Sequence, residues 1–169
     1  PPEKPSMDQA GTDVVSIVNA AHEASIGSPR DLPVRARLGR VYHANGFSSQ
    51  AREAYEQVLA VLPAHGPTIY QLAMLEHEQG NDERARELLV RAIDASGGDV
   101  VMQLRMGAWA MDADDGEQVG RIVESLRRTH PQHPNVQMLD ARHALASGRP
   151  QRVIDVLSPM ASVPNAHPY

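Results

Sequence analysis

Apolar residues recur along this chain at the three- and four-residue spacing of amphipathic α-helices, and helix-breaking residues interrupt them at short intervals. The first stripe, after Thr12 or Asp13 as N-cap, consists of Val14, Ile17, Val18, Ala21 and Ala24. Beyond the break GSPRDLP, the pattern predicts helices at about 33–46, 49–62, 67–80, 81–96, 99–113, 116–129, 135–147 and 150–161. No stretch alternates with period two, so we predict an all-α fold.

The breaks within the predicted helix pairs share one spacing. Gly46, Gly80 and Gly148 are separated by multiples of 34 residues, and Asp114 occupies the missing position. Ala51, Ala85, Val119 and Val153 follow at the same interval. A catalytic loop has no reason to recur in this way, whereas the turn of a helical repeat does. The spacing therefore predicts an array of four helix pairs.

The residues of the first pair resemble the tetratricopeptide repeat. The segment LGRVY (38–42), followed by Ala51, Tyr55 and Pro63, is similar to that family's Leu-Gly, tyrosine, alanine, aromatic and proline pattern. Later copies are looser, and the family's tryptophan position is filled by Arg35, Ile69, Gln103 and Gln137. In the fourth copy Asp140 stands where an apolar residue is expected, and we predict that Leu139 takes over its packing. The resemblance covers residues 32 to 167.

The resemblance and the breaks together divide the chain into seven segments. These are a proline-rich linker (1–11), an N-terminal helix and break (12–31), repeat 1 (32–65), repeat 2 (66–99), repeat 3 (100–133), repeat 4 (134–167) and the start of a truncated fifth repeat (168–169). We therefore expect a fragment of a longer protein. The resemblance implies a right-handed α-solenoid of antiparallel helix pairs, with the first helix of each pair on the concave side.

The amino-acid composition excludes several classes of function. The hydrophobic content is 41%, but aromatics make up only 4%, which suits closely packed helices built from aliphatic residues. A net charge of −5 with intermixed signs argues against nucleic-acid binding. The absence of cysteine excludes disulfides and thiolate chemistry. No apolar run is long enough to span a membrane, and no signal peptide is present. The compartment stays open, with the proline-rich start favouring a bacterial envelope or periplasmic protein over a cytoplasmic one.

Two segments suggest metal sites, and neither satisfies the requirements of one. His130 and His133 form an H-x-x-H pair, but prolines keep them out of a continuous helix and zinc needs three or four convergent ligands. The segment DADDGE (112–117) resembles a calcium loop, yet Val123 stands where the bidentate glutamate belongs. We interpret its acids as caps of the next helix. No nucleophile, base or phosphate loop is set in a recognisable motif, so we predict no catalytic, metal or cofactor site and no enzymatic activity.

The remaining candidate is the surface that the first helices would present. The resemblance implies a peptide-binding groove on the concave side, and helical spacing places in it Arg37, Arg40, His43, Tyr70, Met74, His77, Arg105, Met111 and Arg142. The same stripe includes Leu104, Ala108, Met138 and Leu145. Arginines beside methionine and tyrosine suit a protein or peptide partner with acidic and apolar side chains. Family members that grip a chaperone's C-terminal carboxylate use lysines and asparagines there. The predicted groove contains neither, so we do not expect that partner.

We accordingly expect a protein–protein interaction module, a scaffold or adaptor segment of a larger protein. The alternative is a structural spacer or helper array attached to an enzyme domain outside this chain. The last predicted helix carries Val153, Val156, Leu157 and Met160 on one face. Because terminal repeats need a polar cap, we predict that this face makes an end-to-end contact with another copy or that the helix frays in solution.

Overall fold

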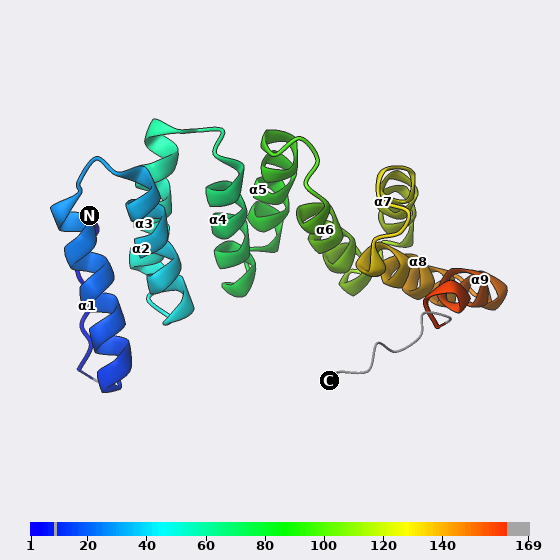
Figure 1. The fold of residues 1–169 in the computed structure, drawn as a ribbon, viewed down its shortest axis with the longest axis horizontal. Coiled ribbons are helices and arrows are strands. Elements are labelled where there is room, and N and C mark those ends of the chain that lie inside the picture. The colour runs from blue at the N-terminus through cyan, green and yellow to red at the C-terminus, as the bar shows by residue number, and fades with distance from the viewer. Residues whose placement is uncertain (9, 162–169) are drawn as a thin grey trace, which may run out of the picture. The chain divides into compact units, whose positions relative to one another are not determined.

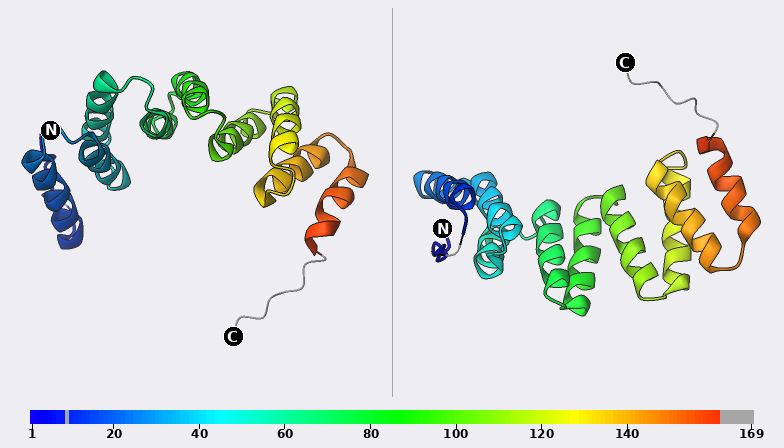
Figure 2. Two further views of the ribbon diagram at one scale, coloured as in Figure 1. Left: turned by 45° about the horizontal axis from the view of Figure 1, so that its top comes forward. Right: turned by 90° about the horizontal axis from the view of Figure 1, so that it is seen from below.

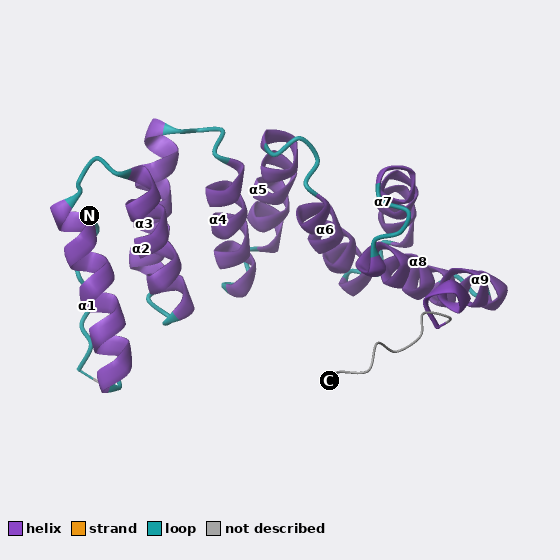
Figure 3. Ribbon diagram, viewed as in Figure 1, coloured by secondary structure: helices purple, strands orange, loops and turns teal. Residues whose placement is uncertain are grey.

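The computed structural model describes residues 1–8 and 10–161 (side chains to residue 158), and every regular element there is an α-helix (Figures 1 and 3). The helices are α1 (Thr12–Gly27), α2 (Leu32–Ala44), α3 (Ser48–Val61), α4 (Gly66–Glu78), α5 (Asp82–Ala95), α6 (Val100–Asp112), α7 (Gly116–Thr129), α8 (Pro134–Ala146) and α9 (Pro150–Ala161). The all-α prediction is confirmed, and the helix ends lie within about two residues of the predicted ones.

The helices form two compact units, Pro1–Gly97 with α1 to α5 and Gly98–Tyr169 with α6 to α9. In the first unit α2 pairs with α3 and α4 with α5, while α1 packs on α2. In the second unit α6 pairs with α7 and α8 with α9. The short turn inside each pair makes its two helices antiparallel (Figure 1).

The recurring turn position has a conformational cause. Gly46, Gly80 and Gly148 have φ values of 79°, 77° and 66°, and Asp114, at the same repeat position, has φ 54°. The left-handed region ends a helix and favours glycine, with aspartate among the few residues that tolerate it. The glycine spacing that indicated a repeat is therefore the spacing of a left-handed helix end.

The Leu-Gly-x-x-Tyr pattern of the first pair corresponds to one close contact. Leu38, Tyr42 and Tyr55 are fully buried, and a Cβ on Gly39 would lie 2.5 Å from the Tyr55 ring. The tyrosine of α3 thus packs on the bare backbone of α2. Glycine here permits a close approach of two helices rather than a special φ angle.

The second unit contains a cluster of buried aliphatic residues. The cluster consists of Ala110, Val119, Val123, Leu126, Val136 and Leu139. Leu139 packs against α6, where a Cβ on Gly107 would lie 2.6 Å from its Cδ2 atom. Leu139 therefore fills apolar space as predicted, and its neighbour Asp140 is buried for a different purpose.

Asp140 is held by two arginines from the flanking helices. Its Oδ2 atom lies 2.6 Å from Nη2 of Arg152 on α9 and 3.5 Å from Nε of Arg127 on α7. Asp140 is only 5% exposed. A carboxylate can be buried when cations pair with it, so this aspartate connects α7, α8 and α9.

The family's tryptophan position is filled in the first repeat by a buried arginine. Arg35 donates from Nε to Oγ of Ser25 at 2.9 Å and from Nη2 to the Pro29 carbonyl at 3.3 Å, and Nη1 bonds to Gln57. The guanidinium therefore connects three parts of the first unit: helix α1, the break that precedes α2, and helix α3. Hydrogen bonds here replace the contacts of an indole ring.

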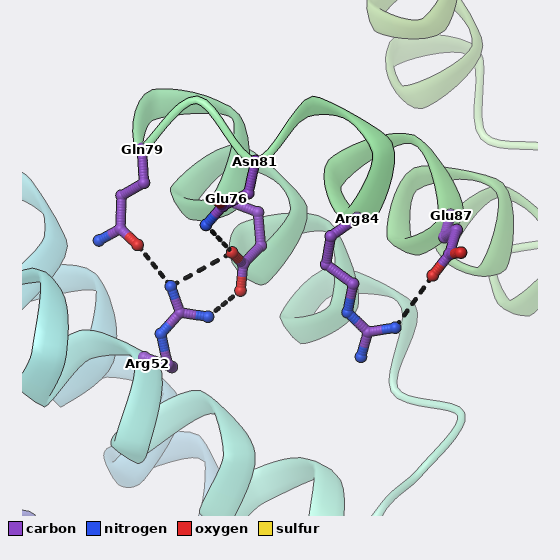
Figure 4. Close-up of polar contacts among 6 residues, drawn as sticks. All are labelled: Arg52, Glu76, Gln79, Asn81, Arg84 and Glu87. Atoms are coloured by element: carbon purple, nitrogen blue, oxygen red, sulfur yellow. Dashed lines mark hydrogen bonds and ion pairs between the residues drawn. The ribbon is translucent and has the colours of Figure 1, made fainter.

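A second buried polar contact joins the two helix pairs of the first unit (Figure 4). Arg52 on α3 donates hydrogen bonds to both carboxylate oxygens of Glu76 on α4, and Gln79 accepts a further bond from the same guanidinium. Nδ2 of Asn81 donates to Glu76 Oε2 at 2.8 Å. Glu76 stands at the repeat position that holds Tyr42 in the first pair, so an ion pair substitutes there for aromatic packing.

The first helix differs from its prediction in its cap and its burial. The N-cap is Gly11, without a side-chain bond, rather than Thr12 or Asp13. Within the apolar stripe Val18 is fully buried, but Ile17 is 53% exposed. The difference arises because α1 packs mainly on one neighbour, α2. The predicted acidic cap in the 112–117 turn is confirmed, since Asp115 accepts from the Gln118 backbone N–H at 2.9 Å.

The last helix is partly covered. Val156 is buried, Val153 and Leu157 are half-buried, and Ile154 is exposed. The side chain of Met160 and the residues of the expected fifth repeat lie outside the described part. The end-to-end contact through this helix stays a prediction.

Candidate functional site

In the second unit, an open hollow of about 310 Å³ lies between α6 and α8. Its lining is Val101, Leu104, Arg105, Ala108, Asn135, Met138, Leu139 and Arg142. α6 and α8 are the first helices of the third and fourth predicted pairs. Two of the predicted groove arginines therefore meet at one site, with apolar side chains between them.

Local sequence sets the two walls of the hollow. Asp99 begins α6 by accepting from the backbone N–H groups of Val101 and Met102, at 2.9 and 3.1 Å. α8 begins with Pro134, which suits the first turn of a helix. The contact of Leu139 with Gly107 brings the two helices together. The floor is thus fixed by core packing, while Val101 and Met138 stay exposed.

The arginines of this hollow differ from four other arginines of the second unit, which pair with carboxylates. Arg127 and Arg152 pair with Asp140, and Arg121 and Arg128 pair with glutamates four residues before them on α7. Among the residues that the structure describes, no carboxylate pairs with Arg105 or Arg142. Both arginines are exposed. The hollow therefore carries two guanidinium groups available to a ligand.

In the first unit, Arg37 lines a separate cavity of about 390 Å³ between α1 and α2. The rest of its lining is apolar: Ile17, Ala20, Ala21, Ala24, Val34, Leu38 and Val41. Arg40, one turn along α2, is exposed, and its charge reaches the buried Tyr55. The pKa of Tyr55 is raised chiefly by burial, which keeps this phenol neutral.

His43 is engaged with neighbouring side chains. Its Nε2 lies 2.8 Å from Glu78 Oε2 on α4, and its ring meets Tyr55 edge-on at a centroid distance of 6.2 Å. Only 12% of the His43 side chain is exposed. This histidine links α2, α3 and α4, so its contribution to a ligand surface is small.

The remaining predicted residues are spread over both units. Tyr70 and Met74 are half-buried on α4, and His77 contacts Asp82 with Nδ1 to Oδ1 at 2.7 Å. Met111 is half-buried and packs against the core of the second unit. The structure brings together Arg105 and Arg142, and it places Arg37 in the cavity beside α1.

Two lining residues were missed by the sequence interpretation. Val101 lies one turn before Arg105 on α6, and Asn135 lies two turns before Arg142 on α8. Both would have been found by continuing the exposed stripe one turn toward the start of each helix. Asn135 also corrects the statement that the groove contains no asparagine.

The described part of the chain contains neither a candidate metal site nor a candidate membrane-spanning helix. No group of three histidine, aspartate or glutamate side chains there is placed to hold a metal ion. No helix in residues 1–8 and 10–161 combines the length and the apolar character needed to cross a membrane.

The paired helices define the class as an all-α solenoid, and solved structures identify its kind. The chain is similar to the crystal structure of MamA, with a TM-score of 0.71 at 14% identity, over 86% of this chain and 85% of that one. It is also similar to BtubC from P. vanneervenii, with a TM-score of 0.73 at 15% identity, over 94% and 77%.

A tetratricopeptide repeat protein from Parabacteroides merdae matches with a TM-score of 0.69 at 15% identity, over 92% of this chain and 60% of that one. The predicted tetratricopeptide-repeat fold is thereby confirmed. No protein-family model and no curated protein matches the sequence.

Proposed function

We propose that this chain is a protein-interaction module whose α6–α8 hollow binds a peptide segment with acidic and apolar side chains. The observation that carries the proposal is the pairing of Arg105 and Arg142 across one apolar-lined hollow. Guanidinium groups hold carboxylates at two points, so two of them can fix both position and direction of a bound segment.

The apolar lining supplies the second part of recognition. Val101 is 57% exposed and Met138 47% exposed, and Leu104 and Ala108 of α6 also line the hollow. A ligand side chain that covered them would remove apolar surface from water at about 25 cal/mol per Å². Methionine adapts its shape to different partners. The hollow therefore favours an acidic residue flanked by aliphatic or aromatic ones.

The cavity beside α1 also combines an arginine with apolar side chains, but it has fewer polar residues than the α6–α8 hollow. Arg37 is the single charged residue in its lining, and Arg40 lies exposed nearby on α2. With Tyr70 and Met74 on α4, these residues make a second candidate surface for the same class of ligand.

The fold comparisons support interaction with proteins as the general role. Two similar solved structures are complexes, the APC/C hetero-tetramer Cut9–Hcn1 and Naa15/Naa10 bound to HypK-THB. The identities are 15% and 13%, so they support a class of function and no particular partner.

A selection of displayed random peptides on the purified chain tests the proposal. We expect enriched peptides to carry aspartate or glutamate beside apolar residues. Arg105→Ala with Arg142→Ala should weaken binding of a selected peptide by at least about 30-fold, since buried arginine contacts cost about 2 kcal/mol on truncation. Binding should also weaken with salt.

The matched control is Arg121→Ala with Arg128→Ala, which removes two exposed arginines of α7 and should leave peptide affinity unchanged. Enriched peptides without acidic residues, or equal affinity for the Arg105/Arg142 variant, would contradict the proposal. Failure to enrich any peptide would favour the alternative, a structural spacer or helper array attached to an enzyme domain outside this chain.

A further inference from the structure

The N-terminal segment has the composition of a linker but is anchored on the first unit. Pro2 and Pro5 are buried, whereas Glu3 and Lys4 between them are exposed. A polyproline II helix has three residues per turn, so two prolines three apart point to the same side. The burial pattern is that of an extended segment with one proline face against the protein.

Charge effects and a shared cavity locate this segment. The charges of Arg35 and Glu53 act on the α-amino group of Pro1, and the charge of Lys4 acts on His22. Farther along, Ser6, Met7 and Ala10 line a cavity of about 300 Å³ with Val14, Asn45 and Phe47. The segment therefore runs antiparallel to α1, and the N-terminus lies level with the end of that helix (Figures 1 and 2).

A row of three aromatic rings ends at the cavity that the segment lines. His22 Nδ1 is 2.7 Å from the Tyr42 hydroxyl, and the Phe47 ring meets Tyr42 edge-on at a centroid distance of 6.3 Å. Phe47 also lines the cavity beside Met7. Aromatic-lined grooves are the surfaces that recognise polyproline II segments, because the preformed helix loses little entropy on binding.

The segment is held without a backbone ladder. In the described residues before α1, the backbone bonds recorded outside the helices include one from Ala10 N–H to the Met7 carbonyl, within the segment itself, and none from residues 1–8 to α2 or α3. Ser6 bonds only locally, to Asp8 at 2.7 Å. Side-chain burial of the prolines is thus the main anchor, and such a segment can detach without unfolding a helix.

We propose that the surface formed by α1, α2 and Phe47 is a binding site for an extended segment with the Pro-x-x-Pro spacing. Pro2 to Pro5 occupies it in cis, and a segment of the same chemistry binds there in trans when the cis segment is released. This site is separate from the α6–α8 hollow and does not depend on the function proposed for it.

The test uses the full chain with Pro2→Ala and Pro5→Ala, which removes both anchors and leaves the site open. The probe is a fluorescent peptide, PPEKPSMD, acetylated and amidated so that its ends carry no charge. We expect the double variant to bind it at least about tenfold more tightly than the unaltered chain, whose own segment competes at high effective concentration. The matched control is Glu3→Ala, which alters an exposed residue and should bind no better than the unaltered chain.

A second peptide, PAEKASMD, distinguishes proline recognition from general stickiness, and we expect it to bind at least about tenfold more weakly to the double variant. Equal binding of the two peptides, or equal affinity of the double variant and the unaltered chain for PPEKPSMD, would overturn the proposal.

The titration of His22 provides a second test, which does not depend on how tightly the peptide binds. Burial lowers the pKa of His22, with added effects of Lys4 and the Pro1 amino group. Release of the segment in the double variant should raise this pKa toward its ordinary value, as followed by the nuclear magnetic resonance titration of the ring. An unchanged titration would show that the segment had not been released and would contradict the anchoring role of the prolines.

Discussion

Arg52 on α3 pairs with the buried carboxylate of Glu76 on α4 and so joins the first helix pair to the second. The Glu76 side chain is 5% exposed and that of Arg52 is 31% exposed. Arg84 and Glu87 on α5 form an ion pair of the other kind, with both side chains more than half exposed. Figure 4 shows both pairs.

Arg52→Ala should destabilise the first unit by about 2 kcal/mol, because it leaves the buried carboxylate without its cation. The partial exposure of Arg52 lets water reach the site, which keeps the loss below that of a fully buried pair. Arg84→Ala is the control and should cost less than about 0.5 kcal/mol. Chemical denaturation followed by circular dichroism measures both, and equal losses would show that burial of Glu76 does not matter.

The left-handed turn position predicts opposite responses at two equivalent sites. Gly80→Ala should lower stability by about 1 kcal/mol, since a Cβ there meets nothing within 4 Å and the cost is purely that of the φ angle of 77°. Asp114→Gly should keep or raise the Tm, because it removes a side chain from the same conformation. A loss from Asp114→Gly as large as that from Gly80→Ala would contradict the shared turn geometry.

Gly39→Ala tests the contact between α2 and Tyr55. Alanine is normally the better helix former by about 1 kcal/mol. Here the added Cβ would lie 2.5 Å from a fully buried ring, and we expect a net loss of about 1–3 kcal/mol by thermal unfolding. Gly116→Ala, which adds a methyl in open space at the start of α7, is the control and should not destabilise. A gain from Gly39→Ala would show that the helices can separate without penalty.

The sequence predicted those features of the fold that are determined by residues close together in the chain. The turns at Gly46 and Gly80 were predictable, because a φ requirement recurs at one spacing. The roles of Arg35 and Glu76 were not, because each replaces an aromatic residue through a partner more than 20 positions away, Gln57 and Arg52. Such substitutions leave no periodic signal.

The candidate site was predictable to a similar extent. Helical spacing placed Arg105 and Arg142 on the exposed stripe of their helices, and both are exposed in the structure. Their meeting across a hollow depends on how closely α6 and α8 approach, which Gly107 and Leu139 decide through tertiary packing. The burial of Pro2 and Pro5 was hidden for the same reason, since composition alone describes a linker.

The buried Asp140 leads to a prediction in the second unit. At this repeat position the other copies have Leu38, Leu72 and Met106. Asp140→Leu should be neutral or stabilising to within about 1 kcal/mol, because Arg127 and Arg152 can reach water once the carboxylate is gone. Arg152→Ala should cost about 1–2 kcal/mol, because it removes the closer partner of a buried charge. The unfolding midpoints of the two variants test this prediction. A larger loss of stability from Asp140→Leu than from Arg152→Ala would contradict it.

His22 predicts a pH dependence of the first unit. Burial lowers its pKa below the ordinary value of about 6.5, so the unfolded chain binds the proton more readily than the folded one. Stability should therefore decline as the pH falls through about 6.5. His22→Gln keeps an acceptor for the Tyr42 hydroxyl and should reduce that decline. Denaturation midpoints at about pH 7.5 and 5.5 measure the difference, and identical pH slopes in both proteins would refute the assignment.

Trp109 gives these measurements an internal reporter. It is the only tryptophan of the chain, it lies on α6, and it is 4% exposed. Selective excitation of the indole therefore reports on the surroundings of α6 in the second unit, while circular dichroism records the helices of both units. Comparing the two signals for a variant at Gly39 or Arg52 shows in one sample, without a label, whether a loss of structure in the first unit extends to α6.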